Sequence, residues 1–170
     1  MDEALVPSIF NPQTGIISYL PDNPLKNGEH TFYIEARNNN GNANWTKPAQ
    51  FFLSLPPTNI RIYSSFSSLP ADGLSSSRLE VAVLDYHGNP VIDGTPVSLD
   101  VSTGRLDKEF ISTVDGWGIA YFFSPKHPKD AEIKARCQKV IGKFTIKCGP
   151  INNALARIAI RDNYHKPVDQ

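Results

Sequence analysis

The sequence predicts an all-β protein, and three observations lead to that prediction. The 170 residues include 14 prolines and 11 glycines, and these are spread along the chain, as in proteins built from many short strands and turns. No stretch repeats apolar residues at helical spacing for more than about one turn. Several short segments instead alternate apolar and polar residues, which places their apolar side chains on one face of a strand.

Composition and charge narrow the classes of function. Hydrophobic residues make up 40% of the chain and charged residues 20%, which is typical of a folded protein rather than a disordered one. Lys+Arg and Asp+Glu both number 17, and no basic stripe or basic amphipathic helix is present, so we expect no nucleic-acid partner and no membrane-surface role. The apolar runs of about five residues are too short to span a membrane, and residues 1–12 do not resemble a signal peptide.

Residues 1–55 are predicted to form a partial domain. The expected strands, each bounded by polar turns, are residues 16–20, 30–38 and 49–55. Four strands at most in a section of this length make about half of a two-sheet sandwich. The strand number therefore indicates that this section lacks its opening strands.

Residues 56–149 are predicted to form a complete domain, because Pro56 and Pro57 read as a linker that cannot lie inside a sheet. The clearest expected strands are residues 59–65, 78–85, 94–102, 116–124, 131–138 and 143–149. Roughly seven strands at spacings of about 8–14 residues are typical of an immunoglobulin-like β-sandwich. The predicted fold is therefore a tandem of such sandwiches.

The C-terminal residues 150–170 are predicted to be a linker and the first strand of a following domain. Their segment "ARIAI" resembles "NIRIY" at the start of the second section. The alternative is a final strand added to the second domain.

The two cysteines, Cys137 and Cys148, are predicted to form a disulfide. With Gly142 at the tip of a two-residue turn, position 137 would face position 148 across a hairpin. Both share the inward parity of their apolar neighbours, and facing Cα atoms about 5 Å apart suit a disulfide. The alternative is a pair of buried free thiols. No further ligand stands at zinc-site spacing beside them.

The polar cluster Asp85, His87 and Asp93 is the best candidate for a metal site or an acid–base pair. The alternative, which we favour, is that the cluster forms two successive turns, His-Gly-Asn-Pro and Asp-Gly. None of the four histidines has a Cys or Ser partner in a recognisable local signature, so nucleophilic catalysis is poorly supported. Residues 38–44 offer no carboxylate to calcium and are read as a solvated turn. We expect no enzyme activity, no metal and no cofactor.

Two aromatic residues, Trp45 and Trp117, are candidate ligand contacts. They lie in or beside predicted turns, so burial explains them less well than it explains the other aromatic residues. In strands, aromatic side chains more often serve as core or cross-strand partners.

Residues 70–148 resemble the group 1 bacterial immunoglobulin-like domain, the repeat of invasin and intimin. The matching segments are residues 70–73 (PADG), 85–91 (DYHGNPV), 97–101 and 113–120, with glycines at 94 and 104. Leu99 replaces the usual aromatic residue and keeps the position apolar. Residues 9–54 resemble, more loosely, another bacterial immunoglobulin-like repeat, at Tyr19, Pro21, Leu25, Gly28, His30, Thr31, Gly41 and Asn42.

The resemblance implies tandem, non-enzymatic modules on the bacterial cell surface or in a secreted protein. Such modules hold an adhesion domain or an enzyme away from the cell. The expected partners are neighbouring immunoglobulin-like domains of the same chain, and a host protein, matrix protein or glycan; a monomer is expected. The alternative function is a carbohydrate-binding accessory module of a secreted polysaccharide-active enzyme.

Overall fold

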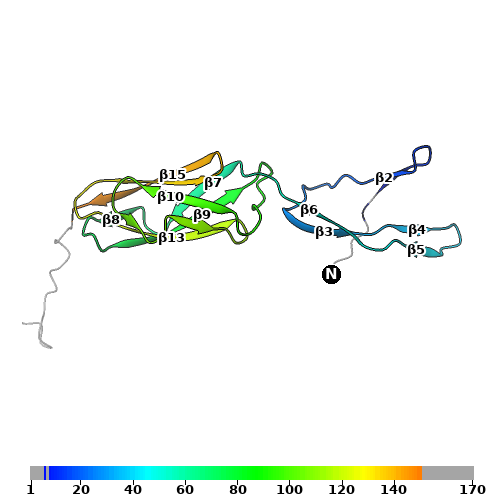
Figure 1. Cartoon of the computed structure of the whole chain (residues 1–170), viewed down its shortest axis with the longest axis horizontal. Helices are drawn as coiled ribbons and strands as arrows, with labels where there is room; N and C mark the ends of the chain where they lie inside the picture. The colour runs from blue at the N-terminus through cyan, green and yellow to red at the C-terminus, as the bar shows by residue number, and fades with distance from the viewer. Residues whose placement is uncertain (1–5, 7, 151–170) are drawn as a thin grey trace, which may run out of the picture.

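The computed structural model describes residues 6 and 8–150, and all regular structure in this part of the chain is β-strand. The all-β prediction is therefore confirmed. In Figure 1 a β-sandwich and a smaller N-terminal section of paired strands follow one another along the long axis. Beyond Pro150, the segment predicted as a linker and first strand of a following domain lies outside the described residues.

The N-terminal section consists of three antiparallel pairs of strands. The pairs are β1 (Ile9–Asn11) with β2 (Ile16–Ser18), β3 (Gly28–Phe32) with β6 (Ala49–Leu53), and β4 (Glu35–Arg37) with β5 (Ala43–Trp45). The strand predicted over residues 30–38 is interrupted between β3 and β4, where the Ile34 amide donates to the Thr46 hydroxyl. The prediction that residue 45 lies in a turn is wrong, because Trp45 pairs with Glu35 in β5.

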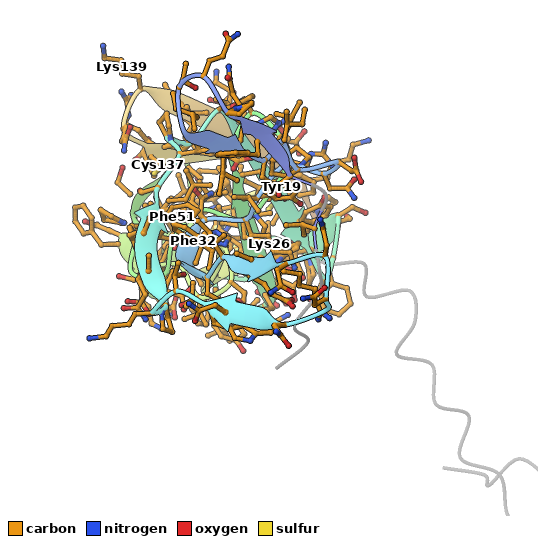
Figure 2. All side chains as sticks on the ribbon, turned by 90° about the vertical axis from the view of Figure 1, so that its right-hand side faces the viewer. Tyr19, Lys26, Phe32, Phe51, Cys137 and Lys139 are labelled. Atoms are coloured by element: carbon orange, nitrogen blue, oxygen red, sulfur yellow. The ribbon has the colours of Figure 1, made fainter. Side chains whose placement is uncertain are left out.

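No side chain is buried among residues 6 and 8–56. Large apolar side chains stand in solvent there, with Ile9 76%, Leu20 88% and Phe52 60% exposed. Viewed along the long axis from this end (Figure 2), Phe32 and Phe51 lie side by side, with ring centroids 6.3 Å apart. The section therefore has paired strands but no packed core within the described residues.

The second section is a two-sheet sandwich. Its strands are β7 (Asn59–Ser64), β8 (Ser68–Pro70), β9 (Ser76–Leu84), β10 (Pro96–Val101), β11 (Arg105–Leu106), β12 (Phe110–Ser112), β13 (Trp117–Phe123), β14 (Ala131–Cys137) and β15 (Val140–Gly149). One sheet has the order β12-β10-β14-β15-β8 and the other β11-β13-β9-β7. The sequence did not indicate β8, β11 and β12, because two or three residues are too few to show alternation.

The core lies between the two sheets and follows the predicted alternation. On β9, the side chains of Leu79, Val81 and Val83 are fully buried. They belong to a continuous cluster with Phe122 of β13 and Ile133 of β14, from the two facing sheets. Apolar side chains at every second position thus make each strand bury one face, which is why the sandwich forms.

The register of the β14–β15 hairpin corrects the disulfide prediction. Cys137 pairs with Val140, so the turn falls at residues 138–139 and Gly142 lies inside β15, opposite Ala135. Gln138 takes the left-handed conformation in that turn, with φ of 53°. At about 3.3 Å per residue, Cys148 lies roughly 26 Å along β15 from Val140, whereas a disulfide needs Cα atoms within about 7 Å.

The two cysteines are therefore free and buried, as the alternative interpretation held. The two side chains do point into the core, as predicted. Only the predicted register of the hairpin is wrong. Desolvation by burial raises the pKa of both thiols, which disfavours the reactive thiolate.

Candidate functional site

The structure does not bring Asp85, His87 and Asp93 together as a catalytic or metal site. One carboxylate oxygen of Asp85, Oδ1, accepts hydrogen bonds from the backbone amides of His87 and Asn89, both at 2.9 Å. Asp93 Oδ1 accepts from the Asp115 amide at 2.7 Å. Asp85 thus caps its own turn, in the arrangement by which Asp stabilises a local backbone bend, whereas Asp93 holds the backbone at Asp115, 22 residues further along the chain. Among the described residues, no three His, Cys, Asp or Glu side chains gather as a metal-binding group.

The second carboxylate oxygen of Asp85 serves a different purpose. It accepts a hydrogen bond of 3.0 Å from the side-chain amide of Asn27, which lies 58 residues earlier in the N-terminal section. The same Asn27 nitrogen donates to the Pro90 carbonyl at 2.9 Å. Asp85 is buried, at 2% exposure, so these bonds lie in a partly desolvated setting where they are stronger than on an open surface.

Further polar contacts complete this joint between the two sections. The backbone amide of Leu55, just before the two linker prolines, donates to Asn27 Oδ1. The Asn89 side chain donates to the Leu25 carbonyl at 3.3 Å. The loop before β3, the linker and the turn at residues 85–90 are therefore held to one another, and Asn27 is the residue that touches all three.

The sequence did not indicate this joint. Asn27 lies in a polar loop with no local signature, and its partners are distant in the chain. The turn motif at residues 85–91 marked the receiving side, but it carries no information about what docks there.

The aromatic candidates Trp45 and Trp117 lie on separate sections. Trp45, on β5, packs against Tyr33 with ring centroids 5.1 Å apart. Trp117, on β13, packs against Tyr63 of β7 at 5.8 Å. Tyr121 follows on the same face of β13. The side chains of Tyr63, Trp117 and Tyr121 are each 43–45% exposed. The outer face of the four-stranded sheet thus carries an exposed aromatic strip.

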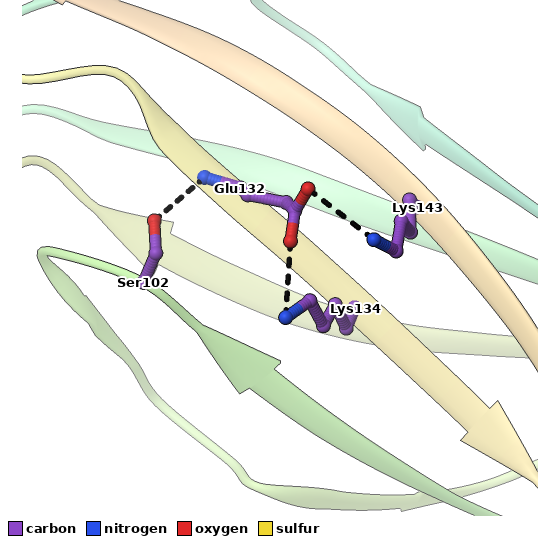
Figure 3. A network of polar contacts seen from close by, with 4 residues as sticks. All are labelled: Ser102, Glu132, Lys134 and Lys143. Carbon is purple, nitrogen blue, oxygen red and sulfur yellow. Dashed lines mark hydrogen bonds and ion pairs between the residues drawn. The ribbon is translucent and has the colours of Figure 1, made fainter.

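The outer face of the other sheet is charged instead. Figure 3 shows Glu132 of β14 between two lysines, with its oxygens 3.0 Å from Lys134 Nζ and 3.5 Å from Lys143 Nζ. The hydrogen bond from Lys134 is the main reason that the pKa of Glu132 lies below its ordinary value. The backbone amide of Glu132 donates to the Ser102 hydroxyl. The two outer faces therefore differ, since one carries a strip of aromatic rings and the other carries paired charges around Glu132.

A basic hollow of about 460 Å³ lies at the end of β13 away from the joint. Its charged lining residues are Arg105, Lys126, His127 and Lys129. The guanidinium of Arg105 stacks over the Phe123 ring at 3.7 Å. Beside the hollow, Asp72 accepts hydrogen bonds from Ser75, Leu74 and Ser124, and the Ser75 amide contributes most to holding the pKa of this carboxyl below its usual range.

Two packed sheets with this strand order, antiparallel except for the parallel pair of β8 and β15, make the second section an immunoglobulin-like domain. No family model matches the chain, and no curated protein matches its sequence. The solved structure of invasin shows the same immunoglobulin-like fold. Invasin, a bacterial integrin-binding protein, superposes with a TM-score of 0.54 and 14% identity, over 79% of this chain and 35% of that one. The D00-D0 domain of intimin gives 0.47 and 15%, over 78% and 70%.

The same fold also occurs within enzymes. A glycosyl hydrolase family 2 member from Bacteroides cellulosilyticus DSM 14838 superposes with a TM-score of 0.50 and 14% identity, over 81% of this chain and 20% of that one. The chain thus spans about a third of the invasin structure and a fifth of the hydrolase. Identity this low establishes the fold and not an activity.

Proposed function

We propose that the chain is a non-catalytic spacer module of a multidomain protein on the bacterial cell surface or secreted from the cell. The joint at Asn27 is the observation that carries the proposal, because it holds two successive sections in one orientation. Within the joint, Asp85, the most promising catalytic candidate, serves as a turn cap and a docking point. The immunoglobulin-like fold of invasin and intimin supports an adhesin-like setting and an extracellular location.

The proposed organisation is a partial immunoglobulin-like domain over residues 1–55, a complete one over residues 56–149, and a linker with the first strand of a following domain over residues 150–170. The exposed apolar side chains of the N-terminal section support the first assignment. A sheet face of this kind in a soluble module requires further strands to cover it, and we assign that role to neighbouring immunoglobulin-like segments of the same protein.

Small-angle X-ray scattering tests the spacer function. We expect an elongated monomer whose maximum dimension matches the end-to-end arrangement in Figure 1, because the linker and the Asn27 joint resist folding back. The scattering profile and the thermal unfolding midpoint should be unchanged by EDTA, since the Asp85 carboxylate at the joint caps a turn. A compact, globular profile would contradict the proposal.

A second candidate function, glycan binding, is favoured by the aromatic strip of Tyr63, Trp117 and Tyr121. Exposed aromatic rings on a flat sheet offer stacking surfaces to sugar rings. If this function is correct, binding on a glycan array is lost in Trp117→Ala and retained in Phe110→Ala, which removes a phenylalanine that is 73% exposed on the other sheet. The Trp45→Ala variant tests the other candidate aromatic residue in the same way. Absence of binding to any glycan would leave the spacer function alone.

A further inference from the structure

We propose that the turn at residues 85–90 is a docking socket selective for a side-chain primary amide. Asn27 supplies this amide and determines that the end of the N-terminal section fits the socket. The inference rests on the proposed spacer function and adds the chemistry by which one section recognises the next. A carboxylate in the position of Asn27 would be rejected.

The socket presents two hydrogen-bond acceptors to one nitrogen. Asp85 Oδ2 and the Pro90 carbonyl lie 3.0 Å and 2.9 Å from Asn27 Nδ2, and a primary amide carries two N–H donors, one for each acceptor. On its other side, Asn27 faces the Leu55 amide, which can only donate. This bond fixes the orientation of the side chain, with its oxygen toward the linker and its nitrogen toward the socket.

The socket itself is prearranged. Asp85 Oδ1 is already engaged by the amides of His87 and Asn89, so the carboxylate cannot turn away without losing the turn. Buried acceptors left unmatched are costly. The socket therefore distinguishes a donor from an acceptor at the incoming position.

The equivalent position in the second section is Asp130. Asn27 directly precedes β3, and Asp130 directly precedes β14. The first residues of these strands pair with Leu53 and Ile146, and in each case the backbone amide two residues further on donates to the side-chain oxygen. These donors are Leu55 and Cys148, the latter at 3.3 Å.

The two module ends thus share one geometry and differ in one chemical group. Both side chains accept a hydrogen bond from the final strand or from the residues just after it. Only Asn27 also has donors for a neighbour, because an ionised Asp is an acceptor alone. The end carrying Asn27 fits an acceptor socket such as Asp85, and the end carrying Asp130 requires a donor socket. Such matching gives specificity by penalising the wrong pairing.

A set of exchanged side chains tests the proposal on the full chain. In Asn27→Asp, the bond from the Leu55 amide is kept, as at Asp130, but two carboxylates face each other and repel. In Asp85→Asn, the turn is kept because Asn also caps such turns, but two amide nitrogens face each other. The double variant Asn27→Asp/Asp85→Asn restores a donor opposite an acceptor between positions 27 and 85, but the Pro90 carbonyl still faces an acceptor. Asp130→Asn is the matched control.

The measurement is the distance distribution between two spin labels by pulsed electron resonance. Exposed positions in the two sections carry the labels, through Gln50→Cys on β6 and Asp100→Cys on β10, while the native cysteines are buried. We expect each single exchange to broaden the distribution by about twofold, since a mispaired joint opens. The double variant should narrow the distribution in part, because the contact with position 85 is restored and the one with the Pro90 carbonyl is not. Asp130→Asn should leave the distribution unchanged.

The outcomes separate this inference from the spacer function. A broad distribution in the unmutated chain would overturn the spacer function. A narrow distribution there and in both single variants, or no recovery in the double variant, would overturn the amide selectivity alone. Thermal unfolding of each variant confirms that the sandwich is intact, because neither exchange removes a core side chain.

Discussion

Phe122→Ala should lower the free energy of unfolding of the sandwich by about 3–5 kcal/mol, the range for removing a buried aromatic side chain. Phe122 is the largest fully buried side chain among the described residues. Its ring also lies directly against Gly104, where an added methyl group would come within 2.7 Å of Phe122 Cε2. Because the surroundings are this close, the core cannot collapse into the space without moving β-strands, and a cavity remains.

Chemical denaturation followed by tryptophan fluorescence measures the loss. Phe110→Ala is the matched control, because Phe110 is 73% exposed on β12 of the same sandwich. Its removal should change stability by less than about 0.5 kcal/mol, as for most surface substitutions. Equal effects of the two substitutions would show that the assigned core is wrong.

Gly142→Ala is the second substitution with a large expected effect, about 1–3 kcal/mol or more of lost stability, because it overpacks the core. A Cβ at this position would lie 2.7 Å from both Ile60 Cγ2 and the Ile60 carbonyl oxygen. The side chain of Ile60 can rotate, but its backbone belongs to β7, paired with Val83 of β9. Relief therefore requires the two sheets to separate where β15 meets β7.

Gly149→Ala, in the same strand, is the control for this substitution. No atom lies within 4 Å of a Cβ added at Gly149, so the unfolding free energy should be almost unchanged. Thermal and denaturant unfolding of the two variants, compared side by side, measure the difference. If Gly142→Ala is as stable as Gly149→Ala, the close approach of β15 to β7 is not real.

The strands and turns with local signals were predictable from sequence. Alternation over the segment at residues 78–85 placed Leu79, Val81 and Val83 on a buried face, as the structure has them. The turn at residues 85–90 followed from its Asp, Gly and Asn, whose conformational preferences act within a few residues. Asp85 was accordingly interpreted as a turn residue rather than a metal ligand, and it does cap the turn.

The hairpin register was beyond local reasoning. In the sequence, Gly142 resembles a turn residue. In the structure, its lack of a side chain is needed because Ile60 approaches it closely, from a strand more than seventy residues earlier. The actual turn contains Gln138 in a left-handed conformation, which a glycine or asparagine would ordinarily signal. A contact between distant strands therefore decided the placement of Cys137 and Cys148.

The sequence by itself thus determined the all-β class, the faces of the longer strands and the turn that receives the joint, because side-chain alternation and turn chemistry are local. Only the tertiary structure decided the functions of Asn27 and of the second oxygen of Asp85. Their hydrogen bond joins residues 58 positions apart, and neither residue has a neighbour in sequence that announces the other. A polar contact of this kind exists only once two segments that are distant in the chain have been brought to the same place.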